Sequence, residues 1–488
     1  MRFARRDYPA SGESKLPLGS GRDHPRPLRR GRDGTLRDLG MLTSHHAGDA
    51  VRRGSFLTWS GGLRDAPARS SGSAARAGMT AAASPAGTRR AEVLTVYAIG
   101  LFQGLSLVAF PAAATILTSA TGYDLSKSQY GLLFVPQVAM AIGGSLALPA
   151  LADRFALKRI LLTGLVADTL AMGLLAGSEP LRTEAIAYPM LLVATGALGL
   201  GFGLTLGSIS TYAGAFMPER RDVALTALNV LLGLGTALSP FLIALFTDVG
   251  QWWYLPLLAA AGLVVLFALA LVQPMALPAA AGGRPPVAGA RGARIPSLFW
   301  VFAAALVIYG IGETMFGNWG TTLLVSKGVA ATSANNGLAV FWAAVTGGRL
   351  VIAMVSTRVR STMIYVVLPW AIAASLLVFP TAGSAGAGIA VFAFGGLACS
   401  GFFPMTVGYG EATFPSIVEL AAGWLIAAYQ LGYGLAAFGA SALQHVVSLA
   451  AVFRIAAAAA VAMAVLAVVV ARRQPRFREA SLPSVSRA

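Results

Sequence analysis

The chain has 488 residues, of which 56% are hydrophobic and only 12% are Asp, Glu, Lys or Arg, and its net charge is +17. A soluble domain carries roughly twice that share of charged residues. The composition therefore excludes an ordinary soluble protein and predicts an integral membrane protein. The single cysteine, Cys399, excludes a disulfide framework and a cysteine-rich metal site.

Residues 1–90 contain more than half of the basic excess, with 17 Lys or Arg against 7 Asp or Glu, a net charge of +10. They show no sustained apolar period and are predicted to be disordered. Such a basic segment could contact anionic lipid or nucleic acid. We favour the alternative that part of it is not native, because Met79 opens a short polar lead into the first apolar run. Nucleic acid is accordingly not an expected partner.

From residue 91 onward the chain is a series of apolar runs, each near the length of about 20 residues that a membrane-spanning helix needs. Twelve runs are predicted as spans: 93–117, 130–151, 159–177, 187–214, 223–247, 253–272, 298–325, 336–356, 362–380, 386–409, 417–441 and 449–471. The lipid bilayer is therefore the expected environment of residues 91–471.

The charges between the runs predict the orientation in the membrane. Loops on the side of residues 1–90, together with the tail 472–488, carry fifteen Lys or Arg. The opposite side carries only Lys127, Arg182 and Lys327, with Arg454 near the start of the last run. By the positive-inside rule, we expect a multi-pass protein of the cell (inner) membrane. Both ends of the chain are then in the cytoplasm.

The long connection 273–297 divides the twelve runs into six and six, and the halves share short motifs. Gly143 opens GGSLALPALADRFALKR and Gly347 opens GGRLVIAMVSTRVRSTM, at the ends of the second and eighth runs. Tyr97 opens YAIG in the first run, and Tyr309 opens YGIG in the seventh. The fold class predicted is all-α, with two pseudo-symmetric six-helix bundles (91–272 and 298–471) and a substrate site between them.

The turn after the second run resembles that of the major facilitator superfamily, whose pattern is roughly G-x-L-A-D-R-x-G-R-K. This chain has PALADRFALKR at 149–159. The matching residues are Leu151, Ala152, Asp153, Arg154 and Lys158. The resemblance covers about 91–471. It implies that Asp153, Arg154, Lys158 and, in the second half, Arg358 gate the cytoplasmic side through charge pairs that form in one state and break in another. The alternative is that these charges only fix the topology.

Runs seven and eight also resemble the fucose–proton symporter-like sugar transporters. The positions that carry this resemblance are Gly312, Glu313, Trp319, Trp342, Thr346, Gly348 and Arg349. The acidic residues that better-understood sugar symporters place in spans one and four are not found here. The exporter motif expected in span five is reduced to GTALSPFLIA at 235–244, which disfavours a drug–proton antiporter.

Three charges inside the runs are candidate functional residues, because burying a charge in hydrocarbon is costly. Glu313 lies near the middle of its run and is the candidate for proton coupling, with a protonated structural glutamate as the alternative. Arg349 could reach the interface, pair with an acid or bind an anionic substrate; a structural role is favoured. Asp168 is expected to be structural because its span is peripheral.

Polar and aromatic side chains on the spans that should line the cavity form a candidate binding set, since amides and aromatic rings suit sugars and other neutral polar molecules. Its members are Gln103, Ser208, Tyr212, Asn229, Asn318, Trp319, Tyr409, Tyr429 and Gln430. Each of them could equally serve as a hydrogen-bonding contact between helices.

No nucleotide-binding loop, metal-ligand spacing or catalytic triad signature is found, so neither an enzyme nor a cofactor is expected. The predicted function is secondary active transport of a small polar solute, a sugar or similar metabolite, by alternating access and with protons as the coupling ion. The protein is expected to be a monomer. Efflux of drugs or metabolites is the alternative within transport, and a non-transporting membrane sensor is the alternative from another class.

Overall fold

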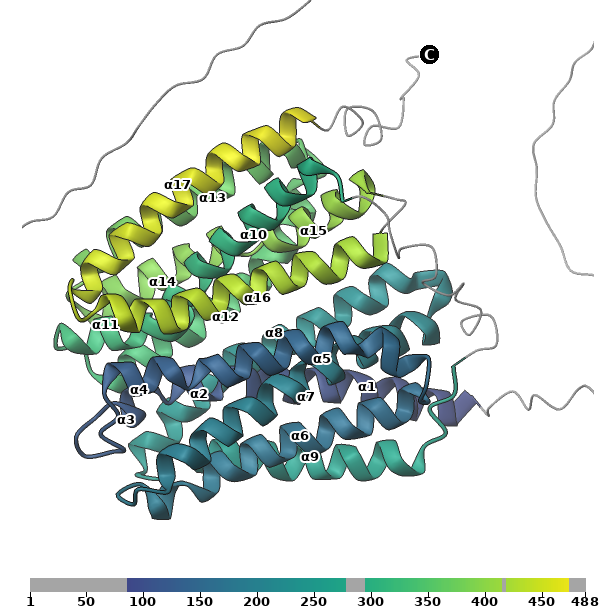
Figure 1. Cartoon of the computed structure of the whole chain (residues 1–488), viewed down its shortest axis with the longest axis horizontal. Helices are drawn as coiled ribbons and strands as arrows, with labels where there is room; N and C mark the ends of the chain where they lie inside the picture. Colours follow the sequence, from purple (N-terminus) through teal and green to yellow (C-terminus); the bar gives the residue numbers. More distant parts are fainter. Residues whose placement is uncertain (1–85, 278–294, 415–417, 474–488) are drawn as a thin grey trace, which may run out of the picture. The chain divides into compact units, whose positions relative to one another are not determined.

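The computed structural model describes residues 86–277, 295–414 and 418–473, and the regular structure in these ranges is helical (Figure 1). Residues 1–85, with Met79, lie outside it, as do most of the connection 273–297 and the tail from 474. The first helix begins at Ala86, so the last residues of the segment predicted to be disordered are helical.

The first six spans are built from nine helices. These are α1 (Ala86–Leu107), α2 (Ala109–Ala112), α3 (Ala114–Leu117), α4 (Lys127–Leu132), α5 (Phe134–Ala152), α6 (Leu157–Gly177), α7 (Ala187–Phe216), α8 (Arg221–Asp248) and α9 (Tyr254–Val272). Span one comprises α1 to α3, because Pro111 lacks the N–H that would bond to the carbonyl of Leu107 and the helix is interrupted at Val108.

The last six spans form the second bundle. Their elements are α10 (Ser297–Thr314), the π-helical turn Met315–Trp319, α11 (Gly320–Ser326), α12 (Ala331–Val355), α13 (Ser361–Val378), α14 (Ala385–Cys399), α15 (Phe402–Thr413), α16 (Val418–Leu443) and α17 (Leu449–Arg473). Span ten is divided into α14 and α15 at residues 400 and 401, where Pro404 removes the next helical hydrogen bond.

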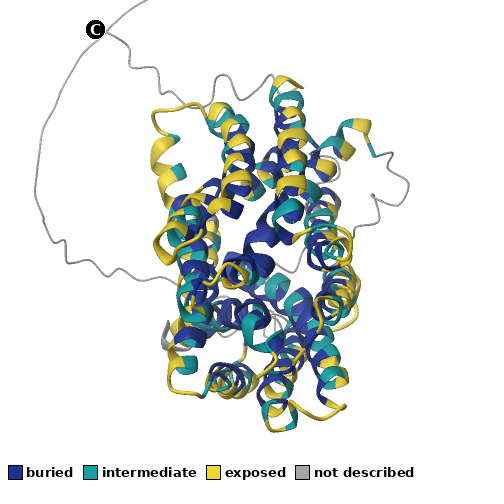
Figure 2. Cartoon of the chain, turned by 90° about the vertical axis from the view of Figure 1, so that its left-hand side faces the viewer, coloured by how far each residue is buried: buried dark blue, intermediate teal, exposed yellow. Residues whose placement is uncertain are grey.

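Eleven of the described helical segments are long and apolar enough to cross a membrane. The 26-residue helix α16 is the remaining span, and with it the predicted twelve are present. Large apolar side chains are exposed on outer helix faces, such as those of Val265, Met354 and Val367, while buried residues gather on the inner faces (Figure 2). Exposed apolar surface of this extent is typical of a protein embedded in lipid.

The two bundles repeat one packing feature, a close crossing of their first and fifth spans. In the first bundle, a Cβ added to Gly104 would overlap the carbonyl oxygen of Leu232, and one on Gly235 would overlap that of Leu101. In the second bundle, Gly432 lies against the carbonyl of Val307 in the same way. Small residues at such crossings let helix backbones approach closely where no hydrophobic effect drives packing.

Two pairs of spans provide most of the contact between the bundles: α8 of span five packs on α12 of span eight, and α4 and α5 of span two pack on α16 of span eleven. Gly233 of α8 faces Thr346 of α12, and Gly434 of α16 faces Val138 of α5. The spans at this junction therefore bring residues from both halves of the sequence to the middle of the molecule, where the candidate site lies.

Candidate functional site

A cavity of about 50 Å³ lies between the two bundles, at the level of the π-turn. Its wall comes from spans one, two and four of the first bundle and from spans seven, eight and eleven of the second. The lining residues are Leu107, Val108, Pro111, Gln137, Val138, Phe202, Asn318, Trp342, Tyr429, Gln430 and Tyr433. A space of this size holds a few water molecules, so the bundles have to separate further to admit a larger solute.

The wall of this cavity is uncharged and mostly apolar. Amides and aromatic side chains supply its polar atoms, and no described Asp, Glu, Lys or Arg lines it. Asn318 donates to the hydroxyl of Tyr433 at 3.3 Å. The Oε1 atom of Gln137 and the Nε1 atom of Trp342 are buried and have no hydrogen-bond partner. One acceptor and one donor are thus available in the wall for a bound molecule.

Glu313 lies directly behind the cavity wall, buried with only 5% of its surface exposed. Its Oε2 atom accepts a hydrogen bond from Tyr429 at 2.6 Å. Its Oε1 atom lies 2.7 Å from the hydroxyl of Tyr309, which is also 2.8 Å from the carbonyl oxygen of Cys399. Tyr429 is the contact between this buried carboxyl group and the cavity, since its side chain also lines the cavity wall.

Among the described residues, Arg349 is the cation whose charge acts on the Glu313 carboxyl group. The two side chains form no ion pair within 4.0 Å among the described residues. The guanidinium is half-buried, and its Nε atom has no hydrogen-bond partner. Arg349 therefore neither reaches the interface freely nor neutralises Glu313 by direct contact.

Asp168 forms a second buried polar group inside the first bundle, away from the cavity. Its two carboxyl oxygens accept from Gln103 Nε2 at 3.2 Å and from Thr205 Oγ1 at 3.0 Å. Gly201 lies so close that a Cβ there would overlap the carboxylate. The group joins spans one, three and four, and it places Gln103 in the helix packing instead of the cavity wall.

The remaining members of the predicted binding set divide between two environments. Asn318, Tyr429 and Gln430 line the cavity. Trp319 is fully buried between the bundles and donates to the carbonyl of Ala436 at 3.2 Å. The structure places the others outside the cavity wall: Ser208, bonded to its own helix; Tyr212, beside Phe216; Asn229, exposed on α8; and Tyr409, beside Tyr365.

The neighbours Asn318 and Trp319 lie at the end of the π-helical turn Met315–Trp319 and face different surroundings. A π-turn adds one residue to a helical turn and changes the direction of the side chains that follow it. Asn318 reaches the cavity, while Trp319 packs edge-on against Tyr130 of the other bundle, with ring centroids 5.3 Å apart. Sequence periodicity alone does not indicate this change.

The bundles are joined by hydrogen bonds at one end, which we call the sealed end, near the connection 118–126. Tyr130 donates to the backbone carbonyl of Asn318 at 3.3 Å, and Ser441 donates to that of Lys127 at 2.8 Å. Ser128 and His445 are 2.7 Å apart. The described structure is therefore closed on the side away from the residues predicted to gate.

The predicted gating residues lie at the opposite end, which we call the basic end. Asp153, Arg154 and Arg358 are exposed, and none of them forms an ion pair within the described residues. Lys158 donates to the carbonyl oxygens of Leu271 and Gln273 at 2.8 and 2.6 Å. In this conformation Lys158 thus caps the C-terminal end of α9, a helix of its own bundle.

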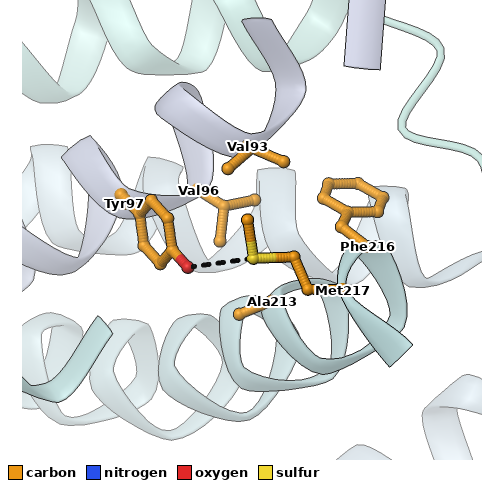
Figure 3. A pocket seen from close by; sticks show the side chains of 6 residues that line it. All are labelled: Val93, Val96, Tyr97, Ala213, Phe216 and Met217. Atoms are coloured by element: carbon orange, nitrogen blue, oxygen red, sulfur yellow. Dashed lines mark hydrogen bonds between the residues drawn. The ribbon is translucent and has the colours of Figure 1, made fainter. Parts of the chain in front are cut away.

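A second, apolar crevice lies between α1 and α7 near the basic end (Figure 3). Its lining residues are Val93, Val96, Tyr97, Ala213, Phe216 and Met217, and it has no room for a water molecule. The only polar contact drawn there joins the Tyr97 hydroxyl to the sulfur of Met217 at 3.9 Å. The crevice belongs to the helix packing and is not a binding site.

Sequence reasoning missed the apolar residues of the cavity wall and five residues that supply polar groups to the site. These five are Gln137, Tyr309, Trp342 and Tyr433, through their side chains, and Cys399, through its backbone carbonyl. Tyr309 could have been found, because it precedes Glu313 by four residues and so shares its helix face. Gln137 is the one amide in the middle of its span, which is also a signal. The contact with Cys399 depends on where α14 ends, and no local pattern shows it.

The fold resembles that of solved membrane transporters. A nucleoside transporter, NupG, aligns with a TM-score of 0.63 and 13% identity over 78% of this chain and 99% of its own. A D-xylose–proton symporter aligns with a TM-score of 0.64 and 15% identity over 80% and 99% of the two chains. A POT family transporter aligns with a TM-score of 0.64 and 13% identity over 78% of this chain and 96% of its own. At these identities the likeness concerns the fold.

No protein among the curated sequences matches this chain. The sequence profile of the Major Facilitator Superfamily, however, matches residues 93–392, which is more than half of the chain. The predicted twelve-span fold in two bundles is confirmed, and the match points to a transporter and not to an enzyme. The chain belongs to the Major Facilitator Superfamily.

Proposed function

We propose that the protein is a proton-coupled symporter for a small, neutral, polar solute of the sugar or polyol type. The observation that carries this proposal is the uncharged wall of the central cavity, whose polar atoms belong to amides and aromatic side chains, with one buried carboxyl group, that of Glu313, directly behind it. The solute and the proton then have separate but adjoining sites.

The cavity wall supports a neutral solute because it offers hydrogen bonds without fixed charge. Gln137 and Trp342 supply a free acceptor and a free donor, and Gln430 and Asn318 add amide groups. A hydroxylated molecule can both donate and accept at each oxygen, so it can satisfy both kinds of group. A charged solute would instead lose its hydration against a wall with no opposite charge.

Glu313 supports proton coupling because a carboxyl group in the membrane interior has to be neutral, paired or hydrated. It has no ion-pair partner within 4.0 Å among the described residues, and two tyrosine hydroxyls are its close neighbours. Opening of the cavity would bring it to water through Tyr429. Binding and release of a proton can thereby follow the change in access.

We further propose that the basic end faces the cytoplasm and that the protein lies in the cell membrane with both termini inside. The sealed end then closes the outward side in this conformation. Asp153 and Arg154 on the first bundle and Arg358 on the second form no ion pair among the described residues. Closure of the basic end would bring the two bundles' charges together, which is the behaviour needed of a gate. The protein is proposed to act as a monomer.

The test is transport into proteoliposomes that contain the full chain, with a panel of D-xylose, L-fucose, D-glucose and glycerol and the charged analogues D-glucosamine and D-gluconate. An inward proton gradient should drive accumulation of a neutral member of the panel, together with alkalinisation outside. Glu313→Gln should abolish gradient-driven accumulation and leave passive exchange of the solute. Glu411→Gln, the same change at an exposed position on α15, should behave as wild type.

Two results would contradict the proposal. One is preference for a charged member of the panel, which would exclude a neutral solute. The other is a Glu313→Gln variant whose accumulation still follows the proton gradient, which would remove Glu313 from the coupling.

A further inference from the structure

We infer that Glu313 carries a proton in this conformation, and that the hydroxyl of Tyr429 is the route by which this proton passes between Glu313 and the cavity. The role given to Tyr429 rests on the proposed function, because it assigns the path of the coupled proton. The protonation itself follows from counting the hydrogens available to three short oxygen–oxygen contacts.

Three contacts surround the carboxyl group. The hydroxyl of Tyr309 is 2.7 Å from Glu313 Oε1 and 2.8 Å from the carbonyl oxygen of Cys399, and the hydroxyl of Tyr429 is 2.6 Å from Glu313 Oε2. Each distance is that of a full O–H···O hydrogen bond. Three such bonds need three hydrogens, whereas the two tyrosines supply only two.

The carbonyl of Cys399 decides where the hydrogen of Tyr309 goes. Cys399 is the last residue of α14, where helix carbonyls have no intrahelical donor. A carbonyl can only accept, and a backbone carbonyl left unpaired inside a membrane is costly. The hydrogen of Tyr309 therefore belongs on the bond to Cys399, and the contact between Tyr309 and Glu313 needs another hydrogen.

A protonated Glu313 supplies this third hydrogen. Its carboxyl O–H then donates to the oxygen of Tyr309, Tyr309 donates to Cys399, and Tyr429 donates to the remaining carboxyl oxygen. An ionised Glu313 would leave two acceptors facing each other across one of these short contacts. The arrangement thus accounts for all three distances only when the carboxyl group is neutral.

The surroundings of Glu313 on each packed helix agree with this assignment. The titratable or charged groups near it are Tyr309 on its own helix α10, Cys399 on α14, Tyr429 and Tyr433 on α16, and Arg349 on α12. Only Arg349 among them is a cation at neutral pH, and it forms no ion pair with Glu313 within the described residues. No direct counter-ion therefore replaces the proton.

Tyr429 is placed to pass the proton because its side chain belongs to both sites. Its hydroxyl bonds to Glu313, and its side chain lines the cavity together with Gln430 and Tyr433. Tyr309, by contrast, is fully buried and is not part of the cavity wall. For release, the carboxyl group turns about its Cγ–Cδ bond so that its O–H points at Tyr429. The hydroxyl of Tyr429 then accepts this proton while it releases its own to a water molecule or a solute hydroxyl in the cavity. Tyr429 thus takes part directly in the transfer, while Tyr309 positions the carboxyl group.

Infrared spectroscopy of the full chain in lipid nanodiscs tests both parts without a transported solute, with D2O as the probe. At neutral pH, wild type should show a protonated-carboxyl C=O band that disappears in Glu313→Gln and remains in Glu411→Gln and Asp168→Asn. In D2O this band should shift as the proton exchanges. Tyr429→Phe should retain the band but slow its exchange by about tenfold or more, as expected on losing one hydrogen bond in a relay.

Tyr433→Phe is the matched control, since Tyr433 lines the same cavity one helical turn further along α16 and its hydroxyl is bonded to Asn318 and not to Glu313. Its exchange rate should equal that of wild type. Absence of a band assigned to Glu313 would overturn the protonated state, and an unchanged exchange rate in Tyr429→Phe would overturn the route. A further outcome is an infrared band and an exchange rate that behave as expected, together with a Glu313→Gln variant that still accumulates solute on a proton gradient. That combination would contradict the proposed function and leave the protonated state and the exchange route of Glu313 supported.

Discussion

The hydroxyl of Tyr130 on α4 donates to the backbone carbonyl of Asn318 in the π-turn at 3.3 Å, and so joins the second span of one bundle to the seventh span of the other. The ring of Tyr130 also packs edge-on against Trp319. Tyr130 therefore contributes both a polar and an aromatic contact to the sealed end. Its hydrogen bond is to Asn318, the residue whose side chain lines the cavity.

Tyr130→Phe should weaken the sealed end while it preserves the ring contact. The lost hydrogen bond stabilises the closed state by about 0.5–1.5 kcal/mol. Its loss should therefore raise the fraction of molecules that are open at the sealed end by about 2- to 10-fold. The measurement is the rate at which a maleimide reacts with a cysteine introduced at the cavity residue Val108. Cys399 is buried and should react little. Tyr188→Phe, whose hydroxyl bonds to Gln129 inside one bundle, should leave the rate unchanged.

Trp342→Phe should weaken solute binding without disturbing the fold, because it removes the unpartnered Nε1–H but keeps an aromatic ring in the cavity wall. If this N–H binds the solute, KM should rise by about 5- to 100-fold, the effect of leaving a buried partner without its bond, while kcat changes little. Trp370→Phe, on the exposed face of α13, is the control. An unchanged KM in Trp342→Phe would show that the N–H does not contact the solute.

Asp168→Ala should destabilise the protein, because it leaves the buried groups of Gln103 and Thr205 without their common acceptor. Each unsatisfied group costs about 1–3 kcal/mol, so the midpoint of thermal unfolding in detergent should fall. Asp168→Asn can keep both contacts and should unfold near the wild-type midpoint. Since Asp168 lies outside the cavity wall, transport per folded molecule should be the same in Asp168→Asn as in wild type.

Gly104→Ala should be destabilising, although alanine favours a helix more than glycine does. The new methyl group would overlap the carbonyl of Leu232 on α8, and separating two helices for one methyl group typically costs about 1–3 kcal/mol. Gly173→Ala on α6 makes the same change where no other atom lies within 4 Å. It should gain up to about 1 kcal/mol from helix propensity. Thermal unfolding of the two purified variants measures the difference, and equal midpoints would refute the packing argument.

The twelve spans could be predicted from the sequence because apolar length alone decides whether a segment crosses a bilayer. The two-bundle plan also followed, since Tyr97 and Tyr309 open similar motifs in corresponding spans. Within the site, Glu313 was found because a carboxyl group in a membrane span is rare and costly. These features depend on composition and local order, which a sequence displays directly.

The partners of Glu313 could be predicted only in part, because Tyr429 and Cys399 come from two other helices, α16 and α14. Tyr429 belonged to the candidate set by its span, but its bond to Glu313 depends on the close crossing of α10 and α16 at Gly310 and Gly432. Gln103 occurs on an expected span, yet its side chain bonds to Asp168 inside the first bundle, and Asn229 is exposed on α8 and does not line the cavity. Helix rotation is set by packing, and hydrophobic runs with little amphipathic character do not indicate it.

The π-turn Met315–Trp319 has a consequence for any comparison of span seven with its counterpart, span one. Residues before the turn and residues after it follow two helical wheels with different phases, so a single wheel drawn through Ser297–Ser326 would assign Asn318 and Trp319 to the wrong faces. The YGIG motif at Tyr309 precedes the turn, whereas the counterpart span is interrupted at Val108. An alignment of the two spans that is correct at Tyr97 and Tyr309 therefore needs a gap or an insertion before it reaches the residues of the cavity. Without it, residues matched by equal spacing further along would lie on different faces of the two helices.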